Sequence, residues 1–134
     1  MTNSLYHLLN KTRGAKAIRK WAKENIQGTT IKHAQFHQEI HISGGGIREF
    51  TNQPHKYFFE KNELLKDLQG VFNAENTIYR GVKKFDRKMS YIFEIELMCE
   101  KSYIIVNQYV GSKPLLYSIS DSENVLIGIE KEKT

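Results

Sequence analysis

The sequence predicts an α+β fold in which N-terminal helices pack on one face of a mainly antiparallel sheet of four to six strands. Two segments in the first half of the chain, residues 4–26 and 60–73, space their apolar residues three and four apart, as helices do. After residue 76 the apolar period falls to two, and short polar turns separate the runs. Strands joined so closely must pair antiparallel, and helices then cover one face of their sheet.

The segment 4–26 is expected to be a basic amphipathic helix. Gly14 weakens its middle by about 1 kcal/mol relative to alanine, so a break near Gly14 is an open alternative. A second stripe at helical spacing is entirely basic and consists of Arg13, Lys16, Lys20 and Lys23. These cations are interpreted either as phosphate contacts or as an ordinary solvated helix face.

A strand is expected over 36–43, because Phe36, Ile40 and Ile42 alternate with polar residues. Gly44-Gly45-Gly46 should then break the strand, in a turn that needs unusual backbone angles or a close backbone approach. Asn52-Gln53-Pro54 predicts another break. The helix predicted over 60–73 should bury Leu64, Leu65, Leu68, Val71 and Phe72 and turn Lys61, Glu63, Lys66 and Asp67 outward.

The second half predicts a meander of four or five strands. Their expected bounds are 77–82, about 91–97, 103–110, 115–120 and 125–129. The whole chain, residues 1–134, is expected to be a single domain, with the helix at 1–27 attached to an α+β body at 36–134.

Composition limits the classes of function. The net charge of +5 lies in residues 1–27, which carry six basic residues against Glu24, whereas residues 28–134 carry equal numbers of both signs. Such asymmetry favours a polyanionic partner such as nucleic acid. No apolar run approaches the roughly 20 residues of a membrane span, and no secretory signal is recognisable, so we expect a cytoplasmic protein without a membrane partner. A single cysteine, Cys99, excludes an internal disulfide and a multi-cysteine zinc site.

Motifs for familiar chemistries are absent from the sequence. It has no Walker loop, no G-x-G-x-x-G, no G-x-S-x-G and no H-E-x-x-H. His37, Glu39 and His41 would share one face of a strand, either as part of a metal or acid/base site or as an exposed face. A metal site normally needs further ligands and second-shell support, so neither a metal nor another cofactor is expected. Cys99 follows an acidic strand that would raise its pKa, which disfavours a catalytic thiol.

A second basic cluster comprises Arg80, Lys83, Lys84, Arg87 and Lys88. Tyr79, Phe85 and Tyr91 lie among these cations. Cations bind phosphates and aromatic rings stack on unpaired bases, so the cluster suggests nucleic-acid binding. An ordinary charged hairpin turn that keeps a sheet edge soluble is the alternative.

The run from Glu39 to Asp121 resembles the barnase–EndoU–colicin–RelE class of nuclease-like domains, in particular those of phage and polyvalent mobile-element proteins. The resemblance lies in four stretches, HISGGGIREF at 41–50, His55-Lys56, the helix at 61–79, and the hairpin YIFEIEL…SYIIVNQYV followed by PLLYSISD at 114–121. Relatives often carry a histidine near the start of the strand that begins here at Ser90-Tyr91, and this chain has none there.

The resemblance implies a metal-independent RNA endonuclease of toxin or mobile-element type, encoded by a bacterium or phage. Such enzymes cleave by attack of the 2′-hydroxyl, which needs a base, an acid and cations. Carried over by position, Arg48 becomes a phosphate-binding cation, His55 a general acid/base, and Tyr117 and Ser118 late-strand site residues. Lys56 and Arg80 or Lys83 would be further RNA contacts.

RNA is then the expected substrate, and the family allows a cognate inhibitor or immunity protein as a partner. Two other functions remain open. One is a non-catalytic module that binds nucleic acid or protein with the same sheet. The other is a dimeric accessory protein whose N-terminal helix buries Leu5, Leu8, Leu9 and Trp21 against a partner.

Overall fold

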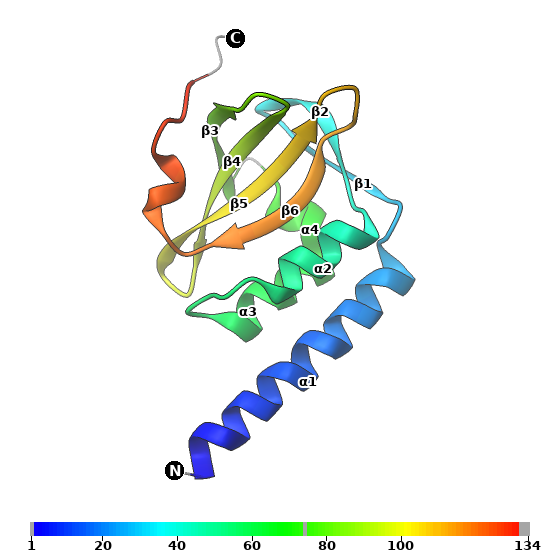
Figure 1. Ribbon diagram of the computed structural model, residues 1–134, viewed down its shortest axis with the longest axis vertical. Coiled ribbons are helices and arrows are strands. Elements are labelled where there is room, and N and C mark those ends of the chain that lie inside the picture. The colour runs from blue at the N-terminus through cyan, green and yellow to red at the C-terminus, as the bar shows by residue number, and fades with distance from the viewer. Residues whose placement is uncertain (1, 74, 132–134) are drawn as a thin grey trace.

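The structure, a computed structural model, describes residues 2–73 and 75–131, with side chains described from Gly14 onward. Helices fill much of the first half and strands most of the second (Figure 1). In chain order the elements are α1 (Thr2–Asn25), β1 (Thr30–His33), β2 (Phe36–His41), α2 (Gly44–Asn52), α3 (Phe58–Glu63), η1 (Leu64–Asp67), α4 (Leu68–Val71), β3 (Thr77–Lys84), β4 (Lys88–Leu97), β5 (Glu100–Tyr109), β6 (Leu115–Ser120) and η2 (Glu123–Leu126).

The strands form one six-stranded sheet in the order β1-β2-β6-β5-β4-β3. Neighbouring strands pair antiparallel except β2 and β6, which run parallel and meet at His41 and Leu115. The predicted α+β class, with a mainly antiparallel sheet of up to six strands, is therefore confirmed. The parallel contact was not expected, and it arises because α2 carries the chain away from β2 before the meander begins.

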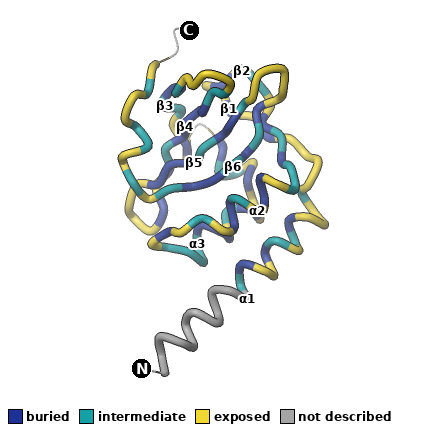
Figure 2. Tube along the Cα trace, in the orientation of Figure 1, coloured by how far each residue is buried: buried dark blue, intermediate teal, exposed yellow. Residues whose placement is uncertain are grey.

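Helices cover one face of this sheet, as predicted. α2 packs on β6, while α1 lies outside α2 and contacts both α2 and α3 (Figure 1). The core lies between the helices and the sheet (Figure 2). It contains Ile47 and Phe50 of α2, Leu65, Leu68 and Phe72 of the following turns, and Ile40, Phe93, Ile104, Leu116 and Ile119 of the strands.

The sheet curls strongly. As a result the hairpin of β1 and β2, at one edge of the sheet, approaches β3 at the opposite edge. The His33 ring donates from Nε2 to the carbonyl of Thr77 at 2.7 Å, and the amide of Tyr79 donates to the side-chain oxygen of Gln35 at 3.0 Å. Phe36 of β2 also packs against the ring of Phe93 on β4, with 5.5 Å between centroids. Side chains therefore join the two ends of the sheet.

The triple glycine begins a helix and does not form the predicted turn. Ser43 caps α2 by accepting the amide N–H of Gly46 at 3.0 Å, and none of the three glycines has a positive φ. A Cβ on Gly46 would lie 2.1 Å from the carbonyl oxygen of Leu116. The predicted close backbone approach is therefore present, and it is what lets α2 pack directly on β6.

The helix expected over 60–73 is divided into α3, η1 and α4. Asp67 accepts the amide N–H of Gly70 and caps α4, which is the local alternative that Asp offers to a continuing helix. Lys61, expected to face outward, is fully buried. The Lys61 ammonium donates to the carbonyl of Phe50, which lies in the last turn of α2 and cannot pair with Pro54, because proline has no N–H.

One strand was not expected, one expected strand is absent, and the open alternative at Gly14 is decided in favour of a continuous helix. β1 was not predicted, since its four residues alternate too briefly to be recognised. The strand expected over 125–129 is replaced by η2, and in this segment only Glu130 pairs with the sheet, at Val82 of β3. α1 continues through Gly14 without a break, and a Cβ there would lie 2.8 Å from the Phe59 ring, so close packing accounts for the glycine.

Candidate functional site

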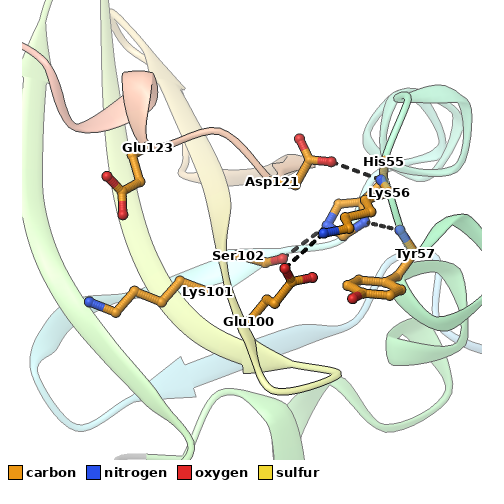
Figure 3. A pocket seen from close by; sticks show the side chains of 8 residues that line it. All are labelled: His55, Lys56, Tyr57, Glu100, Lys101, Ser102, Asp121 and Glu123. Atoms are coloured by element: carbon orange, nitrogen blue, oxygen red, sulfur yellow. Dashed lines mark hydrogen bonds and ion pairs between the residues drawn. The ribbon is translucent and has the colours of Figure 1, made fainter.

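An open hollow of about 360 Å³ lies where the loop between α2 and α3 meets the start of β5 and the segment after β6 (Figure 3). Three segments distant in sequence therefore contribute to it. Its lining consists of His55, Lys56, Tyr57, Glu100, Lys101, Ser102, Asp121 and Glu123.

His55, the histidine to which the resemblance assigns an acid/base role, is buried, with 7% of its surface exposed. Its Nδ1 accepts the amide N–H of Tyr57 at 2.8 Å, so in the neutral ring the proton is on Nε2, which donates to the hydroxyl oxygen of Ser102 at 2.9 Å (Figure 3). Burial lowers the pKa of His55, while the charge of Asp121 opposes this shift. Both ring nitrogens of His55 are therefore engaged in hydrogen bonds within the protein.

The polar groups around His55 are paired with one another. The Lys56 ammonium contacts Glu100 at 2.8 Å, and the Lys56 amide donates to Asp121 at 2.8 Å (Figure 3). Hydrogen bonds from Lys56 and Tyr57 lower the pKa of Glu100, and the same carboxylate raises the pKa of both partners. Two lysines face three carboxylates in this hollow, so carboxylates outnumber cations in its lining.

The other residues assigned a catalytic role by resemblance do not line this hollow. Arg48 is exposed on α2. Tyr117 is half-buried on β6, and its pKa is raised by burial first and then by the charges of Glu49 and Tyr109. Ser118 is buried at 4% exposure and pairs with Ile105 across β5. Of the residues predicted for the site, His55 and its sequence neighbour Lys56 line the hollow, whereas Arg48, Tyr117 and Ser118 lie elsewhere. A catalytic role shared by His55 with Arg48, Tyr117 and Ser118 stays a prediction.

The basic cluster at 80–88 divides into two parts. Arg80 is half-buried and forms an ion pair with Glu94. The remaining cations lie around the β3–β4 turn, where Lys84 and Arg87 are exposed and Lys83 and Lys88 are half-exposed. Tyr79 and Tyr91, expected as stacking surfaces, pack in the core around Phe36, whereas Phe85 is 54% exposed.

The basic stripe of α1 faces outward where its side chains are described. Lys16, Lys20 and Lys23 are exposed and line a shallow hollow of about 320 Å³ with Arg19 and Glu24. The side chains of Arg13, Leu5, Leu8 and Leu9 lie outside the described residues. Arg19 faces the body and donates to the side chains of Thr51 and Asn52, which fixes α1 to the end of α2.

Sequence reasoning missed Ser102 and Asp121 as partners of the loop at 55–57. Ser102 lies on the same strand face as Ile104 and Val106, so it is a polar residue at a core position of β5. A serine at an apolar position of the alternating pattern is visible in the sequence, and it is the signal that could have identified Ser102 as a partner of this loop. Asp121 gave none, because a carboxylate in a turn is ordinary.

The described residues form neither a cluster of metal ligands nor a membrane-spanning helix. Within that part of the chain, no three His, Cys, Asp or Glu side chains gather closely enough to hold a metal ion. His37 and Glu39 are exposed on β2, and His41 is half-buried. The described helices include none that combines the length and apolarity of a membrane span.

Comparison with known proteins gives one match. No curated protein and no solved structure matches the chain significantly. Residues 10–105, more than two thirds of the chain, match a family model described as large polyvalent protein-associated domain 3. The matched range covers most of α1, the β1–β2 and β3–β4 hairpins, the first part of β5 and the loop that carries His55. By this match the chain belongs to the large polyvalent protein-associated domain 3 family.

Proposed function

We propose that this domain is a nucleic-acid-binding module of a large polyvalent protein. The observation that carries the proposal is the cation-rich β3–β4 turn, where Lys84 and Arg87 are exposed beside half-exposed Lys83 and Lys88. The exposed lysines of α1 provide a second basic surface. Cations presented in this way neutralise backbone phosphates and release the counterions condensed on the nucleic acid.

Binding should therefore weaken steeply with salt. For the full chain and a labelled RNA, we expect the logarithm of the affinity to fall linearly with the logarithm of salt concentration. Arg87→Gln and Lys83→Gln should each weaken binding and reduce that slope by about one, as the loss of one phosphate contact does. Fluorescence anisotropy at several salt concentrations measures both quantities.

Lys66→Gln is the matched control, because Lys66 is an exposed lysine on the helical side that pairs with Glu63. It removes the same charge away from the β3–β4 turn, so the salt slope should remain that of the parent. Binding that is insensitive to salt, or equally reduced by all three variants, would contradict the proposal.

RNA cleavage is the second candidate function, and the enclosed His55 beside an open hollow is the observation that favours it. Cleavage would form a bond from the 2′-oxygen to phosphorus and break the bond to the 5′-oxygen, leaving a cyclic phosphate. The 2′-hydroxyl loses its proton to a base, and the 5′-oxygen gains one from an acid. His55 could accept that proton at Nδ1 only after the Tyr57 amide releases it.

The test is incubation of total RNA with the full chain in EDTA, beside His55→Ala and Arg48→Ala. If the domain is a nuclease, the parent produces fragments with cyclic phosphate ends and His55→Ala does not. Because His55 is buried, thermal denaturation must show that His55→Ala is folded, and His55→Gln serves as the variant that conserves volume. Equal fragmentation by the parent and both His55 variants, or none by the parent, rules out this assignment.

A further inference from the structure

Two loops of the sheet meet to form one surface, which we call the loop tip, comprising residues 83–88 and 109–113. The amide of Phe85 donates to the carbonyl of Lys88 at 2.8 Å and closes the β3–β4 turn. Lys88 and Tyr109 are the last pair of the β4–β5 ladder. The amide of Val110 then donates to the carbonyl of Arg87 at 3.1 Å. Backbone bonds therefore hold the two loops together.

The loop tip exposes apolar side chains that the core does not use. Phe85 is 54% exposed, Tyr109 48% and Val110 78%. Single exposed apolar residues are ordinary on protein surfaces, but here three occur on two hydrogen-bonded loops. A cluster of this kind indicates a site that binds a partner with apolar faces.

The loop tip is positively charged, which favours a negatively charged partner. Its cations are Lys83, Lys84, Arg87, Lys88 and Lys113, and the carboxylates on or beside it are Asp86 and Glu130, of which Glu130 pairs with Lys84 at 3.4 Å. The Lys88 ammonium lies 4.9 Å from the centre of the Phe85 ring, so one cation and one ring are presented together. An occupant that offers both flat apolar faces and closely spaced negative charges matches this arrangement.

Building on the nucleic-acid binding proposed above, we propose that the loop tip binds single-stranded nucleic acid, with unpaired bases stacked on Phe85 and Tyr109 and the backbone phosphates held by the surrounding cations. Bases in a duplex hide their faces in the helical stack, whereas unpaired bases present them to aromatic side chains. Stacking is tolerant of sequence, because every base has a π face. The site therefore selects strandedness and not sequence.

The experiment compares a labelled 12-nucleotide RNA, its duplex and the DNA strand of the same sequence, each with the full chain. We expect the single strand to bind more tightly than the duplex, and RNA and DNA single strands to bind within about threefold of one another. Phe85→Ala and Tyr109→Ala should each weaken single-strand binding about tenfold, as the loss of a stacked base does. Tyr109→Phe, which keeps the ring, should bind like the parent.

Ile78→Ala is the matched control, because Ile78 is 51% exposed and lies at the opposite end of β3 from the loop tip. It should leave single-strand binding unchanged. Binding that falls with salt but is indifferent to both aromatic substitutions overturns the stacking site and leaves nucleic-acid binding intact. A preference of more than tenfold for the RNA strand over the DNA strand also overturns the stacking site, as does competition by poly-glutamate that is as effective as competition by single-stranded nucleic acid. If the protein binds no strand at all, both this proposal and the proposed function are wrong.

Discussion

Lys61 supplies the hydrogen-bond donor that Pro54, as a proline, lacks. Its side chain is fully buried, and its ammonium donates to the carbonyl of Phe50, the carbonyl that Pro54 leaves without a helical partner. The ring of Phe58 lies 4.7 Å from the same nitrogen. Burial lowers the pKa of Lys61 to about 7, and the charge of Arg19 acts in the same direction. The residue supplies a necessary donor, but charging it destabilises the fold.

The pH dependence of unfolding should reveal this cost. In the unfolded chain Lys61 has its ordinary pKa of 10.5 and is protonated below it. In the folded chain its pKa is about 7, so it is protonated only below about that pH. Between these values the unfolded state holds more protons, so the contribution of Lys61 to stability declines as pH falls from about 10 to 7. In Lys61→Met this decline disappears, and the change in unfolding free energy over that interval should be smaller by about 2–4 kcal/mol.

Urea denaturation at pH 7 and pH 10 measures the difference. Lys66→Met, at an exposed lysine, is the control and should keep the pH dependence of the parent. An identical pH dependence in Lys61→Met and the parent would show that Lys61 is charged in the folded chain throughout that interval.

At the scale of elements, the contact between α2 and β6 depends on a position without a side chain. Gly46 lies against the carbonyl of Leu116, whereas nothing lies within 4 Å of a Cβ built on Gly45, one residue earlier in the same helix. The two glycines have the same chemistry and neither has a positive φ. A comparison of substitutions at Gly45 and Gly46 therefore distinguishes the effect of close packing from the effect of helix propensity.

Substitution by alanine should act in opposite directions at these two positions. Gly46→Ala forces α2 away from β6 and should lower the free energy of unfolding by about 2 kcal/mol. Gly45→Ala restricts the unfolded chain without a clash and should raise that free energy by about 0.5–1 kcal/mol. Chemical denaturation of both variants checks this, and equal effects of the same sign would mean that the helix–strand contact does not depend on Gly46.

At the scale of the whole molecule, the sheet is held in its curl by aromatic packing. The pairing of β2 with β6 is confined to His41 and Leu115, so the hairpin of β1 and β2 depends on other contacts. Phe36 provides several of them, with ring centroids 4.7 Å from Tyr91 and 5.5 Å from Phe93. These contacts connect one end of the sheet to strands near the other.

Phe36→Ala should lower the free energy of unfolding by about 3–5 kcal/mol, because it removes a buried ring and leaves a cavity. The loss should be greatest in the hairpin of β1 and β2, whose amides should exchange hydrogen faster than those of β4 and β5. Denaturation and hydrogen exchange together test this. Phe85→Ala, at an exposed ring, is the control, and a uniform increase of exchange in all strands would contradict the special role of Phe36.

The sequence by itself determined the fold class and most strand positions, because alternation of apolar residues reports which side of a strand is buried. β6 was predicted at its observed bounds, and α1 and β2 were predicted within a few residues of theirs. Helix α2 was missed, because glycine-rich sequence favours a turn until Ser43 caps it and β6 supports it. Local propensity does not contain these distant partners.

Only the tertiary structure decided which of the predicted functional residues lie together. It brings His55 and Lys56 to Ser102 and Asp121 and leaves Arg48, Tyr117 and Ser118 outside that hollow. It also buries Tyr91 in the core and exposes Phe85 beside Tyr109, although one pattern had suggested both Phe85 and Tyr91 as stacking surfaces. The physical reason is that a site is assembled by strand pairing and loop packing, which join residues tens of positions apart.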